Sequence, residues 1–161
     1  MMVRDVKDDD FDRIAEIYAP YVLETPVSFE YDAPSADELG ARRESFRPFP
    51  YLVLEENGQV MGYAYAHPFA ARRAYRRSAE VTIYIDKAFH GKGGGRLLYT
   101  ELEKGIKSMG YVHNLYALVV HPGFGSVEFH EALGYRTIGI MNGCGEKFGK
   151  LWNIAYMEKI L

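Results

Sequence analysis

The fold is decided by one stretch of the sequence, Ile83-Tyr84-Ile85-Asp86-Lys87-Ala88-Phe89-His90-Gly91-Lys92-Gly93-Gly94-Gly95-Arg96. It reads as the end of a β-strand, a short loop and the start of a helix. Glycines let such a loop turn sharply and approach a ligand with no Cβ in the way. The backbone N–H groups then point at one spot, where the helix dipole adds positive potential. Four glycines beside Lys92 and Arg96 favour a cradle for a diphosphate over the alternative, a flexible turn.

Two widespread phosphate-binding motifs do not fit this loop. A P-loop requires Ser or Thr directly after its lysine, and here Gly93 follows Lys92. A dinucleotide fingerprint counted from Gly91 requires glycine at position 96, where this chain has Arg96. That fingerprint also follows the first strand of a βαβ unit, whereas this loop lies past mid-chain. The sequence therefore predicts a diphosphate ligand of another kind.

Outward from the loop, hydrophobic periodicity and turn residues predict the other elements. Ser35 and Glu38 form a capping box that opens a helix, and Asn57-Gly58 favours a hairpin turn. We expect strands over residues 2–6, 51–55, 60–66, 78–85, 115–120, 135–141 and 151–160. Helices are expected over about 11–23, 35–46, 97–109 and 126–133, and an irregular basic loop over 67–77. The prediction is an α/β (α+β) fold, a mixed sheet of about seven strands with helices on both faces.

Composition predicts one soluble domain spanning residues 1–161. A net charge of -3 gives no electrostatic footprint for nucleic acid. No apolar run is long enough to cross a bilayer, the first ten residues lack a signal-peptide core, and Cys144 has no second cysteine to pair with. We therefore expect a cytoplasmic protein with no membrane partner. Its 13 tyrosines suit either polar-tipped aromatic pockets or ordinary core packing.

The loop resembles that of the GNAT superfamily of acetyl-CoA-dependent N-acetyltransferases, which carry Arg/Gln-x-x-Gly-x-Gly/Ala after the fourth strand. The matching residues are His90-Gly91-Lys92-Gly93-Gly94-Gly95, with His90 where Arg or Gln is usual. The resemblance implies the GNAT fold, with a mostly antiparallel twisted sheet, and acetyl-CoA as co-substrate. It assigns the pantetheine arm to the backbone of Ile83, Tyr84 and Ile85. Arg96, whose charge adds to that of the loop, and Ser126 are also candidate cofactor contacts.

The chain is most similar to the phosphinothricin and methionine-sulfoximine acetyltransferase branch. That similarity is carried by Thr25-Pro26-Val27-Ser28-Phe29-Glu30, Gly62-Tyr63-Ala64-Tyr65-Ala66, Ala71-Arg72-Arg73-Ala74-Tyr75, Glu80-Val81-Thr82-Ile83-Tyr84-Ile85, Ser126 through Tyr135, and Gly145-Glu146-Lys147-Phe148-Gly149. It implies direct acetyl transfer to a small amino-acid-like amine, no metal, and a homodimer. The chain departs from the branch at Pro122-Gly123, at Arg77 before Ser78, and at Leu151-Trp152-Asn153. These departures fall around the acceptor pocket and leave the acceptor open.

The same resemblance assigns the catalytic residues. Acceptor amines are mostly protonated at neutral pH, so a base helps, and Glu80 is the candidate. His130 is an acid or base candidate because imidazole titrates near neutrality. The alternatives are a solvated strand carboxylate for Glu80 and a helix-surface histidine for His130. His121 is interpreted as a strand-end residue and His67 as a loop residue, neither with a catalytic role, and Cys144 as structural.

The acceptor is assigned to a further set of side chains. Arg72, with Tyr75 near it, is the candidate clamp for an acceptor carboxylate, since a guanidinium forks onto a carboxylate. Its alternative is a solvated basic loop. Phe29 and Glu30 are candidate pocket walls, and Thr82 is a candidate substrate contact. Two rival functions stay open, namely acetylation of a protein or peptide amine and non-catalytic sensing of acetyl-CoA.

Overall fold

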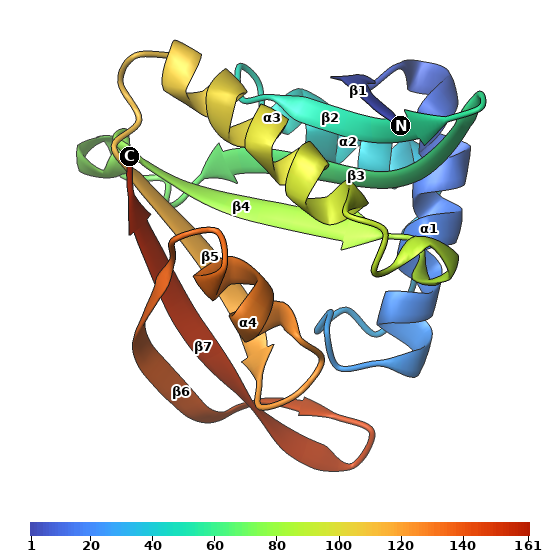
Figure 1. The fold of residues 1–161 in the computed structure, drawn as a ribbon. Coiled ribbons are helices and arrows are strands. Elements are labelled where there is room, and N and C mark those ends of the chain that lie inside the picture. The colour runs from blue at the N-terminus through green and yellow to red at the C-terminus, as the bar shows by residue number, and fades with distance from the viewer.

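The computed structural model describes residues 1–161 and contains one seven-stranded sheet (Figure 1). Its strands are β1 (Met2–Asp5), β2 (Tyr51–Glu56), β3 (Gln59–Pro68), β4 (Ser78–Ile85), β5 (Asn114–His121), β6 (Arg136–Lys147) and β7 (Lys150–Ile160). The spatial order is β1-β2-β3-β4-β5-β7-β6. Every neighbouring pair is antiparallel except β4 and β5, which are parallel. The mixed, mostly antiparallel sheet expected from the sequence is confirmed, and β5 lies inside it between β4 and β7.

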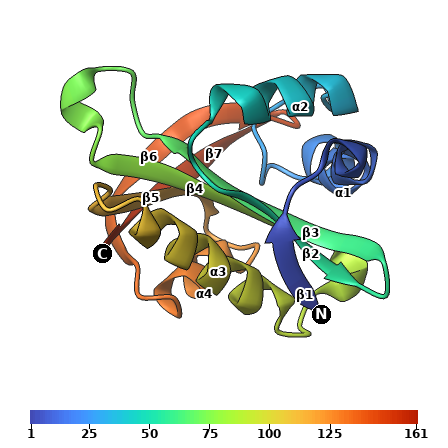
Figure 2. The same ribbon diagram turned by 90° about the horizontal axis from the view of Figure 1, so that it is seen from above.

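Four helices cover the two faces of the sheet, as predicted. They are α1 (Phe11–Glu24), α2 (Ala36–Ser45), α3 (Gly94–Ser108) and α4 (Ser126–Glu131). Figure 2 shows α1 and α2 on one side of the sheet and α3 and α4 on the other. Each side has its own buried apolar layer, one centred on α3 with Leu98, Leu102 and Ile106, the other on α1 with Ile14 and Val22. No helix is long and apolar enough to cross a membrane.

Local signals in the sequence explain where several elements begin and turn. The Glu38 backbone N–H donates to Ser35 Oγ (3.2 Å) and the Ser35 N–H donates to Glu38 Oε2 (2.7 Å), so the capping box is complete. Asn57 and Gly58 have φ values of 52° and 77°, as a tight hairpin between β2 and β3 requires. Gly110, with φ 75°, follows the end of α3.

Two boundaries differ from the sequence prediction. The predicted strand 135–141 is wrong in length, because β6 continues to Lys147. Residues 142–147 are polar and glycine-rich, with no strand pattern of their own. After a register shift between Met141 and Gly145, residues 145–147 pair with β7, and Gly145 lies opposite Trp152. The expected irregular loop 67–77 is also too long, since β3 extends to Pro68 and a short 3₁₀ helix spans Arg73–Tyr75.

The sheet is split where the parallel pair separates. β4 and β5 pair at three positions only, Ser78 with Asn114, Ala79 with Leu115 and Glu80 with Tyr116. Beyond Glu80 the two strands diverge, which Figure 1 shows as a widening gap between β4 and β5. The rest of β4, as far as Ile85, therefore has a strand partner only in β3.

Candidate active site

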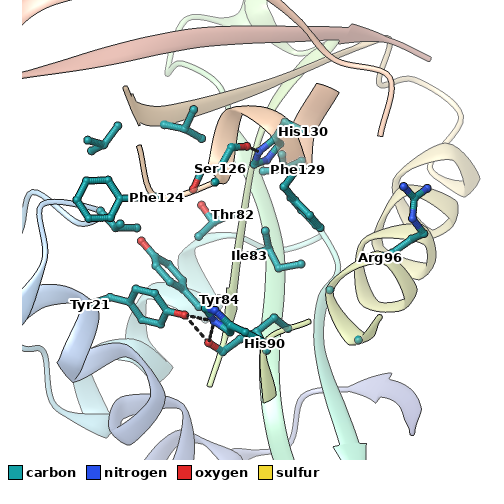
Figure 3. Close-up of a pocket in the computed structure, with 18 of the residues that line it drawn as sticks. Tyr21, Thr82, Ile83, Tyr84, His90, Arg96, Phe124, Ser126, Phe129 and His130 are labelled. Atoms are coloured by element: carbon teal, nitrogen blue, oxygen red, sulfur yellow. Dashed lines mark hydrogen bonds between the residues drawn. The ribbon is translucent and has the colours of Figure 1, made fainter. Parts of the chain in front are cut away.

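A cavity of about 470 Å³ lies where β4 and β5 diverge. β4 forms one wall, the end of β5 and the start of α4 form the opposite wall, and the glycine-rich loop closes one end (Figure 3). Most of the predicted site residues lie together on these walls: Glu80, Thr82, Ile83, Tyr84, Ile85, His90, Gly91, Gly93, Gly94, Gly95, Arg96, Ser126 and His130.

The glycine-rich loop has the backbone geometry that its sequence indicates. Gly91 and Gly93 have φ values of 75° and 81°, in the left-handed region that favours glycine, and space above both is open. Gly94 is required for another reason, because a Cβ there would lie 2.6 Å from the Leu54 side chain. Arg96 lies on the cavity wall. Lys92 does not line the cavity, and the Lys92 Nζ lies 4.6 Å from the centre of the Phe89 ring. The loop thus presents open backbone to the cavity at the start of α3.

At the lip of the cavity, His90 is held by a residue of α1. Its Nε2 lies 2.7 Å from the Tyr21 hydroxyl and 3.0 Å from the Ile85 carbonyl, and Tyr21 also donates to that carbonyl (Figure 3). A carbonyl only accepts, so Nε2 carries the hydrogen. Burial raises the pKa of Tyr21 to about 12 and keeps the hydroxyl protonated. Tyr21 was missed in the sequence, although it lies one helical turn beyond Tyr18 on the apolar stripe of α1.

His130 is a buried residue of α4 with one unpaired nitrogen. Its Nδ1 lies 2.7 Å from the Ser126 carbonyl and therefore donates, which leaves Nε2 as an acceptor. That Nε2 is buried and has no hydrogen-bond partner. Burial lowers the pKa of His130, which favours the neutral ring. The side chain is thus set to accept a hydrogen bond rather than to donate one through Nε2.

Glu80 occupies the point where the two parallel strands separate. Its side chain is 25% exposed and lies opposite His67 of β3, with 3.9 Å between Glu80 Oε2 and His67 Nε2. Burial raises the pKa of Glu80 above its usual range, and the His67 imidazole, when protonated, opposes that rise. A carboxylate with a raised pKa in a cavity is suited to accept a proton near neutral pH. The pairing with His67 was missed, because only the strand register reveals it.

Four predicted acceptor residues lie outside this cavity. Arg72 precedes the short Arg73–Tyr75 helix and is exposed, and Tyr75 packs edge-on against Phe69 at 5.6 Å. Glu30 is bound by Arg42 of α2, and Phe29 packs so tightly on Gly145 of β6 that a Cβ there would overlap its ring. The loop that carries Phe29 and Glu30 does reach the cavity, but through Val27.

Lys147, at the end of β6, is a buried charge that fixes that loop. Its Nζ donates to the carbonyls of Val22, Thr25 and Ser28, and burial lowers the pKa of the ammonium. The lysine thus satisfies free carbonyls at the end of α1 and holds Val27 at the cavity. In the sequence, Lys147 was noted only as part of the Gly145–Gly149 segment that carries the family resemblance. Its role could not be predicted there, because the carbonyls that it binds lie more than a hundred residues away in the chain.

Comparison with known proteins identifies the class. The family model described as an acetyltransferase (GNAT) domain matches residues 3–154. The chain therefore belongs to the GNAT acetyltransferase family.

Several individual members of this family and several solved structures are similar to the chain over nearly its whole length. The chain is 36% identical to a phosphinothricin N-acetyltransferase of Alcaligenes faecalis, covering 99% of this chain and 82% of that one. It is 30% identical to an L-methionine sulfoximine/L-methionine sulfone acetyltransferase of Salmonella typhimurium, covering 98% and 93%. Among solved structures, a phosphinothricin acetyltransferase from Sinorhizobium meliloti in complex with AcCoA has a TM-score of 0.94 at 34% identity over 99% and 88% of the two chains. A ribosomal-protein-alanine N-acetyltransferase from Brucella melitensis has a TM-score of 0.95 at 29% identity over all of both chains.

Proposed function

We propose that this acetyltransferase transfers the acetyl group of acetyl-CoA directly to the amine of a small amino-acid-like acceptor of the phosphinothricin or methionine sulfoximine type. The observation that carries the proposal is the position of the open-backbone loop and of Glu80 on the walls of one cavity. The loop is suited to bind the diphosphate of the cofactor, and Glu80 is suited to accept a proton from the amine. The 161 residues act together as one such domain.

The cavity fits acetyl-CoA in three respects. Gly91 and Gly93 present backbone without side chains at the start of α3, which suits a diphosphate. The edge of β4 beyond Glu80 is unpaired on the β5 side and is free to bind the amide groups of the pantetheine arm. His130 Nε2 is a buried acceptor that requires a donor, and an amide N–H of the pantetheine arm supplies one. Acetyl-CoA supplies the reactive thioester.

Glu80 acts as the base in this proposal. It accepts a proton from the acceptor ammonium, directly or through one water, and the neutral nitrogen then attacks the thioester carbonyl. The new C–N bond forms, the C–S bond breaks, and the second proton of the nitrogen passes to the leaving thiolate. The raised pKa of Glu80 brings the carboxylate closer to the proton affinity that this step needs at neutral pH.

A homodimer accounts for two further features. The β6–β7 arm exposes the apolar side chains of Ile138, Ile140, Met141 and Leu151, a pattern typical of an interface. Arg72 and Tyr75 lie outside the cavity of their own chain. In a homodimer, these residues would contact an acceptor bound to the neighbouring subunit. A cytoplasmic location fits the single unpaired cysteine, Cys144.

The alternative acceptor is a protein N-terminus, favoured by the full-length likeness to the Brucella melitensis structure. Purified protein is given acetyl-CoA with phosphinothricin, L-methionine sulfoximine or an alanine-initiated peptide, and free thiol is measured. We expect acceptor-dependent thiol release with at least one of the two amino acids and none with the peptide. Release with the peptide alone would favour the alternative. Acetyl-CoA binding without release on any acceptor would favour a sensor.

A further inference from the structure

His67 is the group from a neighbouring strand that faces Glu80. The two residues are direct partners in the antiparallel β3–β4 ladder, so their side chains leave the same face of the sheet. His67 Nε2 lies 3.9 Å from Glu80 Oε2, and both side chains are about a quarter exposed, at 23% and 25%. The sequence prediction gave His67 no catalytic role.

The ring of His67 is held in one orientation by two contacts. It stacks on Phe46, at the end of α2, with 5.0 Å between centroids and 26° between planes. Its Nδ1 lies 2.9 Å from the Pro68 carbonyl and therefore donates. Nε2 is consequently the atom turned to Glu80. A neutral ring would face the carboxylate with a lone pair, whereas a protonated ring faces it with an N–H and a positive charge.

Other polar groups around Glu80 are neutral or already paired. Tyr65 lies two residues before His67 on the same face of β3. Tyr116 of β5 lies opposite the carboxylate and donates its hydroxyl to Glu158 of β7 at 3.1 Å. Arg42 of α2 is bound to Glu30. When protonated, the imidazole is therefore the unpaired charge that acts on the carboxylate.

We propose that His67 is a positioning residue for Glu80, holding the carboxylate in its ionised, proton-accepting form. This inference rests on the proposed role of Glu80 as the base. Desolvation at the point where β4 and β5 separate favours the neutral carboxyl group, which cannot accept a proton. A protonated imidazole on the adjacent strand opposes that effect. The reaction is unchanged in its atoms and protons, and His67 extends the pH range over which Glu80 works.

Two variants separate charge from packing. His67→Phe keeps an aromatic ring on Phe46 and removes the charge, whereas His67→Lys keeps a charge and removes the ring. The measurement is kcat/KM against pH with the better acceptor amino acid, beside wild type and the exposed-histidine control His113→Gln. With His67→Phe, we expect the acidic limb of the profile to move to higher pH by about half a unit, the size typical of a partly exposed ion pair. His67→Lys should keep that limb at or below its wild-type position, and the control should match wild type.

Each result bears on one claim. If packing alone matters, the order reverses, with His67→Phe like wild type and only His67→Lys impaired, and the inference is overturned. Melting temperatures confirm that both variants fold. Glu80→Gln separates the two proposals. A fully active Glu80→Gln enzyme would show that Glu80 is not the base, and both proposals would fail. If Glu80→Gln is inactive and the pH profile of His67→Phe does not move, only the inference about His67 is overturned.

Discussion

At the scale of single residues, position determines what each titratable group can do. Glu80 and Glu30 are both glutamates on the side of the sheet covered by α1 and α2. The Arg42 ion pair holds the pKa of Glu30 below its usual range, whereas burial raises that of Glu80. Only the carboxyl group with the raised pKa lines the cavity. The local environment therefore makes one glutamate a structural anion and the other a candidate base.

Glu80→Gln tests that assignment, because the amide has nearly the same shape and cannot accept the proton. Turnover at neutral pH should fall by about 10²–10⁴-fold. Acetyl-CoA affinity should change little, since backbone groups provide most of the proposed cofactor contacts. A wild-type carboxylate is protonated as the pH falls through its raised pKa, so the wild-type rate should drop there and the variant should lack that limb. The defect should shrink at high pH, where more of the amine is neutral without help.

The measurement is a pH–rate profile of both enzymes with one acceptor. Wild-type turnover by Glu80→Gln across the neutral range would assign the proton to another group or to bulk water. Glu55, which pairs with Arg4 away from the cavity, provides the matched control, and Glu55→Gln should keep the wild-type profile.

At the scale of elements, the site depends on a strand pair that separates and a loop that follows it. β4 leaves β5 after Glu80, and the chain from Ile85 to Gly94 then turns back into α3 on the far face. The loop glycines serve two purposes. Gly94 lets α3 pack against Leu54, and Gly93 takes a left-handed conformation beneath open space.

Gly93→Val tests whether that open space belongs to the cofactor. Valine adds strain at φ 81° and a side chain where a diphosphate would approach. Gly58→Val is a close control, because Gly58 has φ 77°, also lies beneath open space, and sits in the β2–β3 turn away from the cavity. Both variants should lose similar stability. Only Gly93→Val should bind acetyl-CoA about tenfold or more weakly by calorimetry, a difference of about 1.4 kcal/mol. Equal affinities of the two variants would place the phosphates elsewhere.

At the scale of the whole molecule, the cavity is lined from both sides of the sheet. Tyr21 and Val27 reach it from the α1 side, and Phe129 and His130 reach it from the α4 side. Lys147 also ties the β6–β7 arm to the end of α1. A ligand in the cavity would therefore contact both halves of the split sheet at once.

Acetyl-CoA should accordingly stabilise the whole fold. A ligand that binds only the native state contributes about 2.7 kcal/mol at one hundred times its Kd. For a domain of this size that corresponds to a rise in Tm of roughly 5–10 °C. NAD and ATP should give no comparable rise in a thermal-shift experiment. No shift with saturating acetyl-CoA would contradict the proposed cofactor site.

The sequence by itself determined most of the elements and the open backbone of the glycine-rich loop. Capping residues, glycines and apolar periodicity are local signals, so Ser35, Asn57-Gly58 and the strand 78–85 were placed correctly. Resemblance through the motif from His90 to Gly95 supplied the family. Glycine-rich residues 142–147 carried no such signal, and their strand was missed.

Tertiary structure alone decided which side chains meet. Register set His67 opposite Glu80, and long-range packing brought Tyr21 to His90 and Lys147 to the end of α1. The same packing left Arg72 and Tyr75, the candidate clamp for an acceptor carboxylate, outside the cavity. The physical reason is that periodicity fixes which face a residue occupies, whereas its neighbours on that face depend on pairing between segments far apart in the chain.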